Sequence, residues 1–182
     1  MVVRALVVGA SGMLTEVARW LAVQGYQVTV VGRDQARLER VRDGSGYPHL
    51  FTLLPLDYGQ TDQLCEAMEQ LMAEQEHIEL VVAWIHSTAP EAISTIQQVL
   101  CRQKKKWSLY HVCGSRAWIH PPLVQEVAGC SYHRIILGFV CEEKGSRWLT
   151  NEEIAQGVIS AIQSKEPQNI VGSVEPWDKR PS

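Results

Sequence analysis

One stretch near the start of the chain reads Val2-Val3-Arg4-Ala5-Leu6-Val7-Val8-Gly9-Ala10-Ser11-Gly12-Met13-Leu14. The apolar run before Gly9 is rich in β-branched residues and lacks polar alternation, which is typical of a strand covered on both faces. The residues after it predict a turn with two glycines and a helix that begins near Gly12. Gly9 permits a tight turn, and Gly12 lets an anion approach the backbone at the positive end of the helix. The stretch therefore predicts a phosphate-binding loop, with a βα turn that binds no nucleotide as the alternative.

Apolar runs and helical patterns alternate along the rest of the chain. Strand–helix alternation predicts right-handed βαβ units, and hence an α/β, Rossmann-like, doubly wound parallel sheet in three layers with strand order 3-2-1-4-5-6. A ligand would bind at the carboxyl ends of the strands, between the first and the fourth. Between the fifth and sixth strands only a brief helix fits, within 121–129. The further strands are predicted over residues 28–31, 50–56, 78–85, 107–112 and 134–140, with a short seventh strand near 169–171.

Two Thr-x-x-Glu sequences predict capping boxes at helix starts. One begins at Thr88 and the other at Thr150. No linker or repeat divides the chain, so residues 1–172 are predicted to form one domain of ordinary size. The remaining residues, 173–182, contain two prolines and are predicted to form a loose tail.

The composition excludes several classes of protein. With 46% hydrophobic and 20% charged residues, the chain is not of the disordered kind. Its net charge is 17 − 20 = −3, and its basic run over 102–106 follows a predicted helix end, where cations complement the dipole, so nucleic acid is not an expected partner. No stretch without charged residues exceeds 13 residues, and no signal-peptide pattern opens the chain, so no membrane association is expected. Five scattered cysteines favour a reduced, cytoplasmic protein.

From Val2 to about Ile162 the chain resembles the short-chain dehydrogenase/reductase superfamily. The glycine turn matches the G-x-x-G-x-x-G form of the extended and atypical branches at Gly9 and Gly12, with Thr15 in place of the third glycine. The resemblance implies a domain that binds NAD or NADP. The residues that it assigns to the cofactor pyrophosphate are those of the turn: Gly9, Ala10, Ser11, Gly12, Met13 and Leu14.

Three further segments fall where this superfamily contacts its cofactor. Arg33, at the end of the second predicted strand, stands where NAD-dependent members carry an acid, and an arginine there can pair with the 2′-phosphate of NADP. Asp57 and Tyr58 resemble residues that contact the adenine, and Ala83 and Trp84 occupy the place of a stretch packed along the cofactor. NADP (NADPH) is therefore predicted in preference to NAD. The alternatives are a surface arginine at a strand end and an aspartate that caps the next helix.

The Tyr-x-x-x-Lys pair that typical members use in catalysis is absent from the sequence. The residues four positions after the five tyrosines are Val30, Phe51, Asp62, Gly114 and Ile136. Because the lysine lowers the pKa of the tyrosine for proton transfer, the usual alcohol–carbonyl chemistry is not expected. The resemblance leaves Ser115 and His86 as candidate catalytic residues beside the nicotinamide. The alternatives are a loop serine that satisfies a backbone group and a histidine that only packs at a strand end.

Three functions fit these residues. The first is an atypical NADPH-dependent oxidoreductase that transfers hydride to a small acceptor such as a flavin or a quinone, whose ring needs less acid–base help. The alternative is a non-catalytic NADP(H)-binding redox sensor, and a third is a domain that binds another nucleotide or none. The expected partners are a small-molecule acceptor and further copies of the chain in a homo-oligomer. No metal site is expected, because the six histidines are dispersed.

Overall fold

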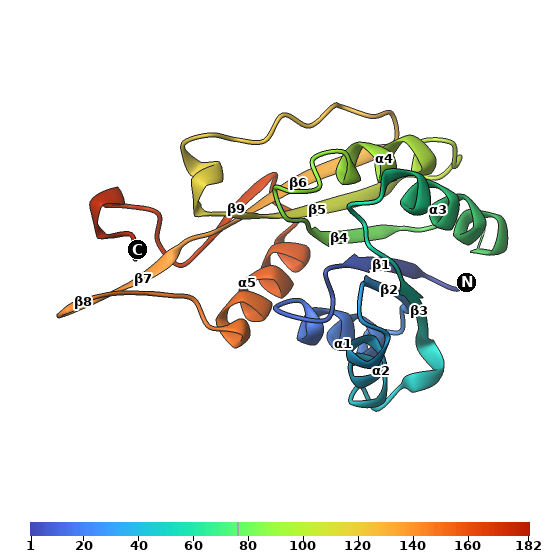
Figure 1. Ribbon diagram of the computed structural model, residues 1–182, viewed down its shortest axis with the longest axis horizontal. Helices are drawn as coiled ribbons and strands as arrows, with labels where there is room; N and C mark the ends of the chain where they lie inside the picture. The colour runs from blue at the N-terminus through green and yellow to red at the C-terminus, as the bar shows by residue number, and fades with distance from the viewer. Residues whose placement is uncertain (76) are drawn as a thin grey trace.

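A seven-stranded parallel sheet forms the centre of the molecule (Figure 1). The computed structural model describes residues 1–75 and 77–182. The strands of the sheet are β1 (Arg4–Val8), β2 (Gln27–Gly32), β3 (Phe51–Pro55), β4 (Leu80–Trp84), β5 (Trp107–Gly114), β6 (Cys130–Leu137) and β9 (Gln168–Val171). They follow the order β3-β2-β1-β4-β5-β6-β9. The predicted order 3-2-1-4-5-6 is therefore confirmed, and the short seventh strand joins the sheet beside β6.

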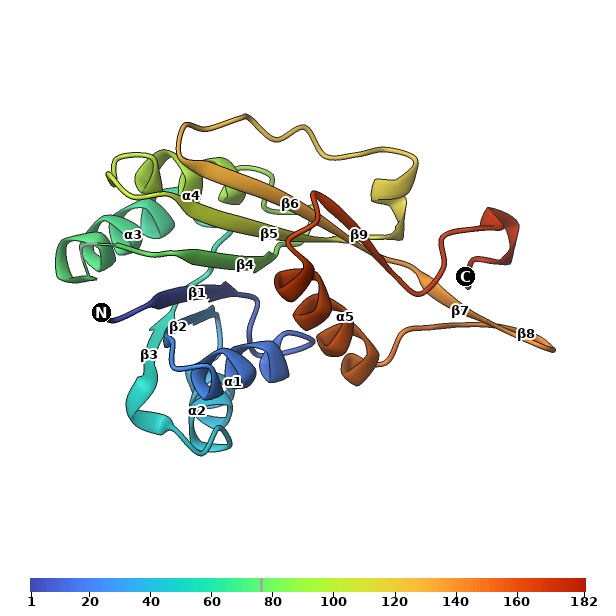
Figure 2. The same cartoon turned by 180° about the vertical axis from the view of Figure 1, so that it is seen from behind.

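Helices cover both faces of the sheet and complete the predicted three-layer, Rossmann-like fold (Figures 1 and 2). On one face lie α1 (Thr15–Val23), α2 (Gln35–Asp43) and α5 (Asn151–Ser164), and on the other lie α3 (Thr61–Gln75) and α4 (Ala92–Leu100). Within the described residues, no helix combines the length and the apolar character that a membrane crossing requires. Short 3-10 helices lie in the connections: η1 (Pro48–Leu50), η2 (Ser115–Trp118) and η3 (Trp177–Lys179).

The side chains of β1 explain why its sequence shows no polar alternation. Val7 packs in the core on the side of α1, α2 and α5, whereas Val8 packs in the core on the side of α3 and α4. Both are fully buried, because the sheet separates two apolar layers. Val8 lies opposite Val31 of β2 and Ala83 of β4, so the carboxyl ends of these three strands meet at one edge. The predicted ligand crevice lies at this edge.

The strand predicted over 134–140 is divided in the structure. β6 ends before Gly138, and β7 (Phe139–Glu142) then pairs antiparallel with β8 (Gly145–Trp148) in a hairpin that extends beyond the sheet (Figure 2). A Cβ at Gly138 would overlap the carbonyl group of Ser173. The later segment thus approaches the chain closely at the point where β6 ends, and apolar periodicity does not reveal such an approach.

The first helix begins later than its sequence pattern predicts. Residues 9–14 form turns, and α1 starts at Thr15 rather than near Gly12. The Thr15 hydroxyl donates to the Ala10 carbonyl at 2.7 Å and so closes the turn from within. The two glycines therefore belong to one turn that precedes the helix rather than to the helix itself.

Between β5 and β6 the described chain forms only η2 and an extended segment over 119–129. The brief helix that would fit within 121–129 is not formed there. The Gln97 side chain of α4 instead donates to the Gln125 carbonyl at 3.0 Å, which holds this segment in an extended path beside α4.

One of the two predicted capping boxes is confirmed. At the start of α5, the Thr150 side chain accepts from the Glu153 N–H and the Glu153 side chain accepts from the Thr150 N–H. The box predicted at Thr88 is not formed by the described residues, because α4 starts only after Glu91, whose side chain caps nothing. Residues 86–89 form a turn instead, in which the Ala89 N–H donates to the His86 carbonyl.

The segment after β9 contacts the body of the molecule, although the sequence predicts a loose tail from residue 173. Phe139 and Ser173 exchange two backbone hydrogen bonds of 2.8 Å, and Val174 is buried. Arg180, which follows η3, reaches η2 and donates from its Nε to the Ser115 Oγ at 2.9 Å. These contacts hold the segment from Ser173 to Arg180 beside the carboxyl edge of the sheet.

Candidate cofactor and substrate site

The turn between β1 and α1 is built around Gly9. Its φ of 82° lies in the left-handed region, and a Cβ at this position would lie 2.6 Å from the Trp84 carbonyl oxygen of β4. The Gly9 N–H donates to the Val31 carbonyl of β2 at 3.1 Å. The backbone of this residue is thus confined between two neighbouring strands, and only glycine fits there.

The second glycine of the turn faces open space. Gly12 is exposed, and a Cβ at this position would meet no heavy atom within 4 Å. Of the described side chains, none caps α1, whose N-cap residue is Leu14. Free N–H groups at the start of a helix and an unobstructed approach over a glycine are the features that bind a pyrophosphate. The turn therefore fits a dinucleotide.

The end of β2 lies beside this turn. A Cβ on Gly32 would lie 3.4 Å from the Ser11 Oγ, so the next residue, Arg33, is close to the predicted phosphate loop. Arg33 is exposed and forms no ion pair with a described residue. Its neighbour Asp34 caps α2 by accepting from the Arg37 N–H at 3.0 Å. The Arg33 guanidinium is thus available to a phosphate group of a ligand.

Asp57 and Tyr58 follow β3 at the same edge. The Asp57 carboxylate accepts from the Gly59 N–H at 2.9 Å, so it closes the turn that leads to α3. This bond closes a turn before α3 begins at Thr61, so it is not the helix cap that the sequence left as the alternative. Tyr58 is half-buried against the core beneath α3 and α4. A contact of either residue with an adenine stays a prediction.

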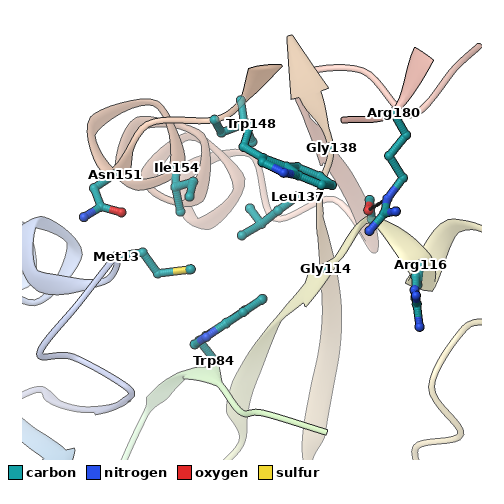
Figure 3. Close-up of a pocket in the computed structure, with 12 residues that line it drawn as sticks. Met13, Trp84, Gly114, Arg116, Leu137, Gly138, Trp148, Asn151, Ile154 and Arg180 are labelled. Atoms are coloured by element: carbon teal, nitrogen blue, oxygen red, sulfur yellow. Dashed lines mark hydrogen bonds between the residues drawn. The ribbon is translucent and has the colours of Figure 1, made fainter. Parts of the chain in front are cut away.

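A pocket of about 410 Å³ opens at the carboxyl ends of β4, β5 and β6 (Figure 3). Met13 brings the glycine turn to one side of it, and Trp84, Leu137 and Ile154 give it apolar walls. The pocket adjoins the turn. A dinucleotide whose pyrophosphate is bound at the turn could therefore place its nicotinamide ring in the pocket. The polar side chains that line it are those of Ser115, Arg116, Asn151 and Arg180.

The two candidate catalytic residues lie in different cavities. Ser115 is buried in the wall of the pocket, and its Oγ accepts from Arg180. His86 is exposed beyond the end of β4, with its ring 6.0 Å from that of Trp84 in an edge-on arrangement. It lines a neighbouring cavity of about 340 Å³ together with His111. The structure therefore does not bring Ser115 and His86 together.

The remaining predicted residues differ in what they offer to a ligand. Ala83 is fully buried in the sheet, so only the next residue, Trp84, lines the pocket. Sequence reasoning missed Asn151 and Arg180. The capping box at Thr150 could have located Asn151, since it fixes the first residue of α5. No local signal marks Arg180, because its contact with η2 joins residues 65 positions apart.

A second group of titratable side chains lies on β5 and β6, outside this pocket. The His111 Nδ1 and the Tyr132 Oη are 3.0 Å apart. Burial, aided by the Arg134 charge, lowers the pKa of His111 to about 4, and burial raises the pKa of Tyr132. Burial also raises the pKa of the Cys113 thiol to about 12, so it is not a thiolate nucleophile at neutral pH. Across residues 1–75 and 77–182, no three His, Cys, Asp or Glu side chains are grouped to hold a metal ion.

The fold of the chain occurs in solved structures of short-chain dehydrogenases/reductases. A glucose/ribitol dehydrogenase of this class from Brucella melitensis aligns with a TM-score of 0.71, covering 92% of this chain and 94% of its own, at 11% sequence identity. A short-chain type dehydrogenase/reductase from Mycobacterium marinum aligns with a TM-score of 0.72, covering 93% of each chain, at 19% identity. A metagenomic short-chain oxidoreductase in complex with NADP aligns with a TM-score of 0.68, covering 93% of this chain and 95% of its own, at 14% identity. No protein-family model and no curated protein matches the sequence.

Proposed function

We propose that this protein is an NADP-binding oxidoreductase of the short-chain dehydrogenase/reductase type that works without a Tyr/Lys pair. The observation that carries the proposal is the open glycine turn next to a pocket: Gly12 is unobstructed, no described side chain caps α1, and Met13 belongs both to the turn and to the pocket wall. The Rossmann-like fold supports the proposal, and so does the structural neighbour that was solved with NADP.

Arg33 supports NADP rather than NAD. It is exposed beside the turn and has no acidic partner among the described residues. A guanidinium forms two charge-assisted hydrogen bonds with a phosphate, whereas the ribose hydroxyl of NAD at the same place offers it no charge.

In this proposal the chain binds and orients its ligands. The turn holds the pyrophosphate, and the apolar walls around Trp84 and Leu137 exclude water from the place where the reacting rings meet. When bound, NADPH supplies the hydride for a small acceptor. A flavin or quinone-like acceptor suits this pocket. A conjugated ring delocalises the negative charge that arrives with the hydride, so it depends less on the proton that a Tyr/Lys pair would donate.

Titration with NADPH and NADH, followed by the quenching of tryptophan emission, tests the proposal. We expect NADPH to bind more tightly than NADH. We expect Gly12→Val to lose both nucleotides and to keep its melting temperature, because the added side chain enters the space over the turn without meeting protein atoms. Normal nucleotide binding by Gly12→Val would refute the assignment of the turn. A flavin, a quinone and a small aldehyde are then added while the absorbance of reduced nicotinamide is followed.

A non-catalytic NADP(H)-binding redox sensor is the second candidate. It is favoured by the position of His86 outside the pocket of Ser115, which leaves that pocket without a paired acid and base among the described residues. Tight binding of NADPH with no oxidation by any acceptor of the panel would support the sensor. Oxidation by any one of them would exclude it.

We also propose a cytoplasmic location and a homo-oligomer. The five cysteines are all free, which supports a reducing compartment. Light scattering coupled to size-exclusion chromatography measures the mass of the assembly and tests the second point.

A further inference from the structure

We propose that the pocket recognises a small molecule that carries a carboxylate, and that Arg180 of the C-terminal segment binds this group. The proposal deepens the proposed function, because it names the acceptor class of the same pocket and rests on that function for the transfer of hydride. It is carried by the placement of Arg180, by its partners and by the charges around it.

The C-terminal segment is attached at both ends, so Arg180 has a defined place. The paired hydrogen bonds between Phe139 and Ser173 attach the segment to β7. Farther along, the Ser146 hydroxyl of β8 donates to the carbonyl of Lys179. Arg180 follows directly, and its side chain lines the pocket (Figure 3).

Three side chains position the Arg180 guanidinium. Its Nε donates to the buried Ser115 Oγ at 2.9 Å, which makes Ser115 a positioning residue. Its Cζ lies 4.8 Å from the ring centroid of Trp148 and 5.4 Å from that of Trp177. The described residues give its two Nη groups no hydrogen-bond acceptor. The two Nη groups therefore form a free edge of the guanidinium, and the aromatic rings fix its orientation. Such an edge matches the two oxygens of a carboxylate.

No acidic side chain balances this charge within the pocket. Of the 12 described residues that line it, none is Asp or Glu, and Arg116 adds a second positive charge. Arg147 of the neighbouring β8 differs, because it pairs with Glu142 and Glu153 at 2.9 Å. A guanidinium without an acidic partner in an apolar pocket attracts an anion and is poorly matched to a neutral ligand. The preferred ligand is therefore a carboxylate on an aromatic or otherwise apolar body, such as a quinone-like ring that itself bears the carboxylate.

The position of Arg180 favours the carboxylate of an acceptor over a phosphate of the cofactor. Figure 3 shows Arg180 on the opposite side of the pocket from Met13, the residue that brings the glycine turn to this site. A pyrophosphate bound at the turn would lie on the Met13 side. The Arg180 guanidinium therefore remains free to bind the acceptor, the second ligand of the pocket.

Benzoate and its uncharged isostere benzamide are the probes, because they have nearly the same size and shape and differ in charge. Each is titrated by tryptophan emission, first without nucleotide and then with NADPH. We expect benzoate to bind the wild type about 10- to 100-fold more tightly than benzamide, the range expected for charge-assisted hydrogen bonds. Arg180→Gln should abolish this preference and Arg180→Lys should keep part of it. The matched control Lys179→Gln removes a cation of the same segment that lies outside the pocket, and should keep all of it.

Equal affinities of benzoate and benzamide for the wild type would overturn the proposal, whatever the variants do. A preference that persists in Arg180→Gln would overturn it as well. NADPH affinity is measured on the same variants, and we expect Arg180→Gln to leave it unchanged. A parallel loss of NADPH affinity would assign Arg180 to the cofactor phosphates and overturn the proposal. Failure of NADPH to bind the wild type would overturn the proposed function alone, because the comparison of the two probes requires no nucleotide.

Discussion

Gly9 and Gly12 lie three residues apart in one turn, yet only Gly9 is packed against a neighbouring strand. Gly9→Ala places a methyl group against the Trp84 carbonyl at a positive φ, so we expect it to lower the free energy of unfolding by about 1–3 kcal/mol. Gly12→Ala is the matched control and should change that free energy by less than about 0.5 kcal/mol. Urea denaturation of both variants measures the difference. Equal stabilities of the two variants would show that Gly9 is not confined between β2 and β4.

Arg33 is the residue on which the preference for NADP depends. We expect Arg33→Glu to weaken NADPH binding by about 1–3 kcal/mol, because a charge-assisted bond to the 2′-phosphate is lost, and to leave NADH binding little changed. Arg37→Glu makes the same change of charge on the next helix, beyond the Asp34 cap, and serves as the control. Calorimetric titration of the wild type and of both variants with both nucleotides gives the affinities to be compared. An unaltered NADPH affinity in Arg33→Glu would remove this residue from the site.

The start of α5 shows how one helix element supports the pocket. The capping box at Thr150 fixes the first turn of α5, from which Asn151 and Ile154 face the pocket. We expect Thr150→Ala to cost about 1 kcal/mol of folding free energy, the usual value of an N-cap. Thr88→Ala removes the same hydroxyl from the other Thr-x-x-Glu sequence, where it caps nothing, and should be neutral in chemical denaturation. A comparable loss from both variants would mean that the hydroxyl of Thr150 does not act as a cap.

The acid stability of the whole molecule depends partly on His111. Between pH 6.5 and 4 the unfolded chain binds a proton at this residue that the folded chain does not, so falling pH favours unfolding in this window. We expect this proton uptake to lower the free energy of unfolding by about 3 kcal/mol at pH 4. We expect His111→Gln to have a flatter profile of unfolding free energy against pH. His49→Gln, at an exposed position, should follow the wild type. Coincident profiles for His111→Gln and the wild type would show that His111 titrates normally.

The layout of the sheet could be predicted from the sequence because each βαβ unit is a local pattern whose handedness places the next strand. The glycine turn could be predicted for the same reason, since its residues are contiguous. The pocket could not, because Ser115 meets Arg180 across 65 positions and β6 ends where Ser173 lies against Gly138. Such contacts form after the sheet has brought distant segments together, and neither apolar periodicity nor turn chemistry encodes them.

Because Arg180 lies in the C-terminal segment, the two proposed binding elements of the site are synthesised at different times. During synthesis the glycine turn emerges before the rest of the site, whereas Arg180 emerges only after β9 and the turn back along β7. A nascent chain, or one clipped by a protease before Ser173, therefore contains the residues proposed to hold a dinucleotide and lacks the guanidinium proposed to select an acid. If a preparation binds NADPH but not benzoate, its intact mass should therefore be measured first. Only a chain that still contains Arg180 can test whether this residue binds the carboxylate.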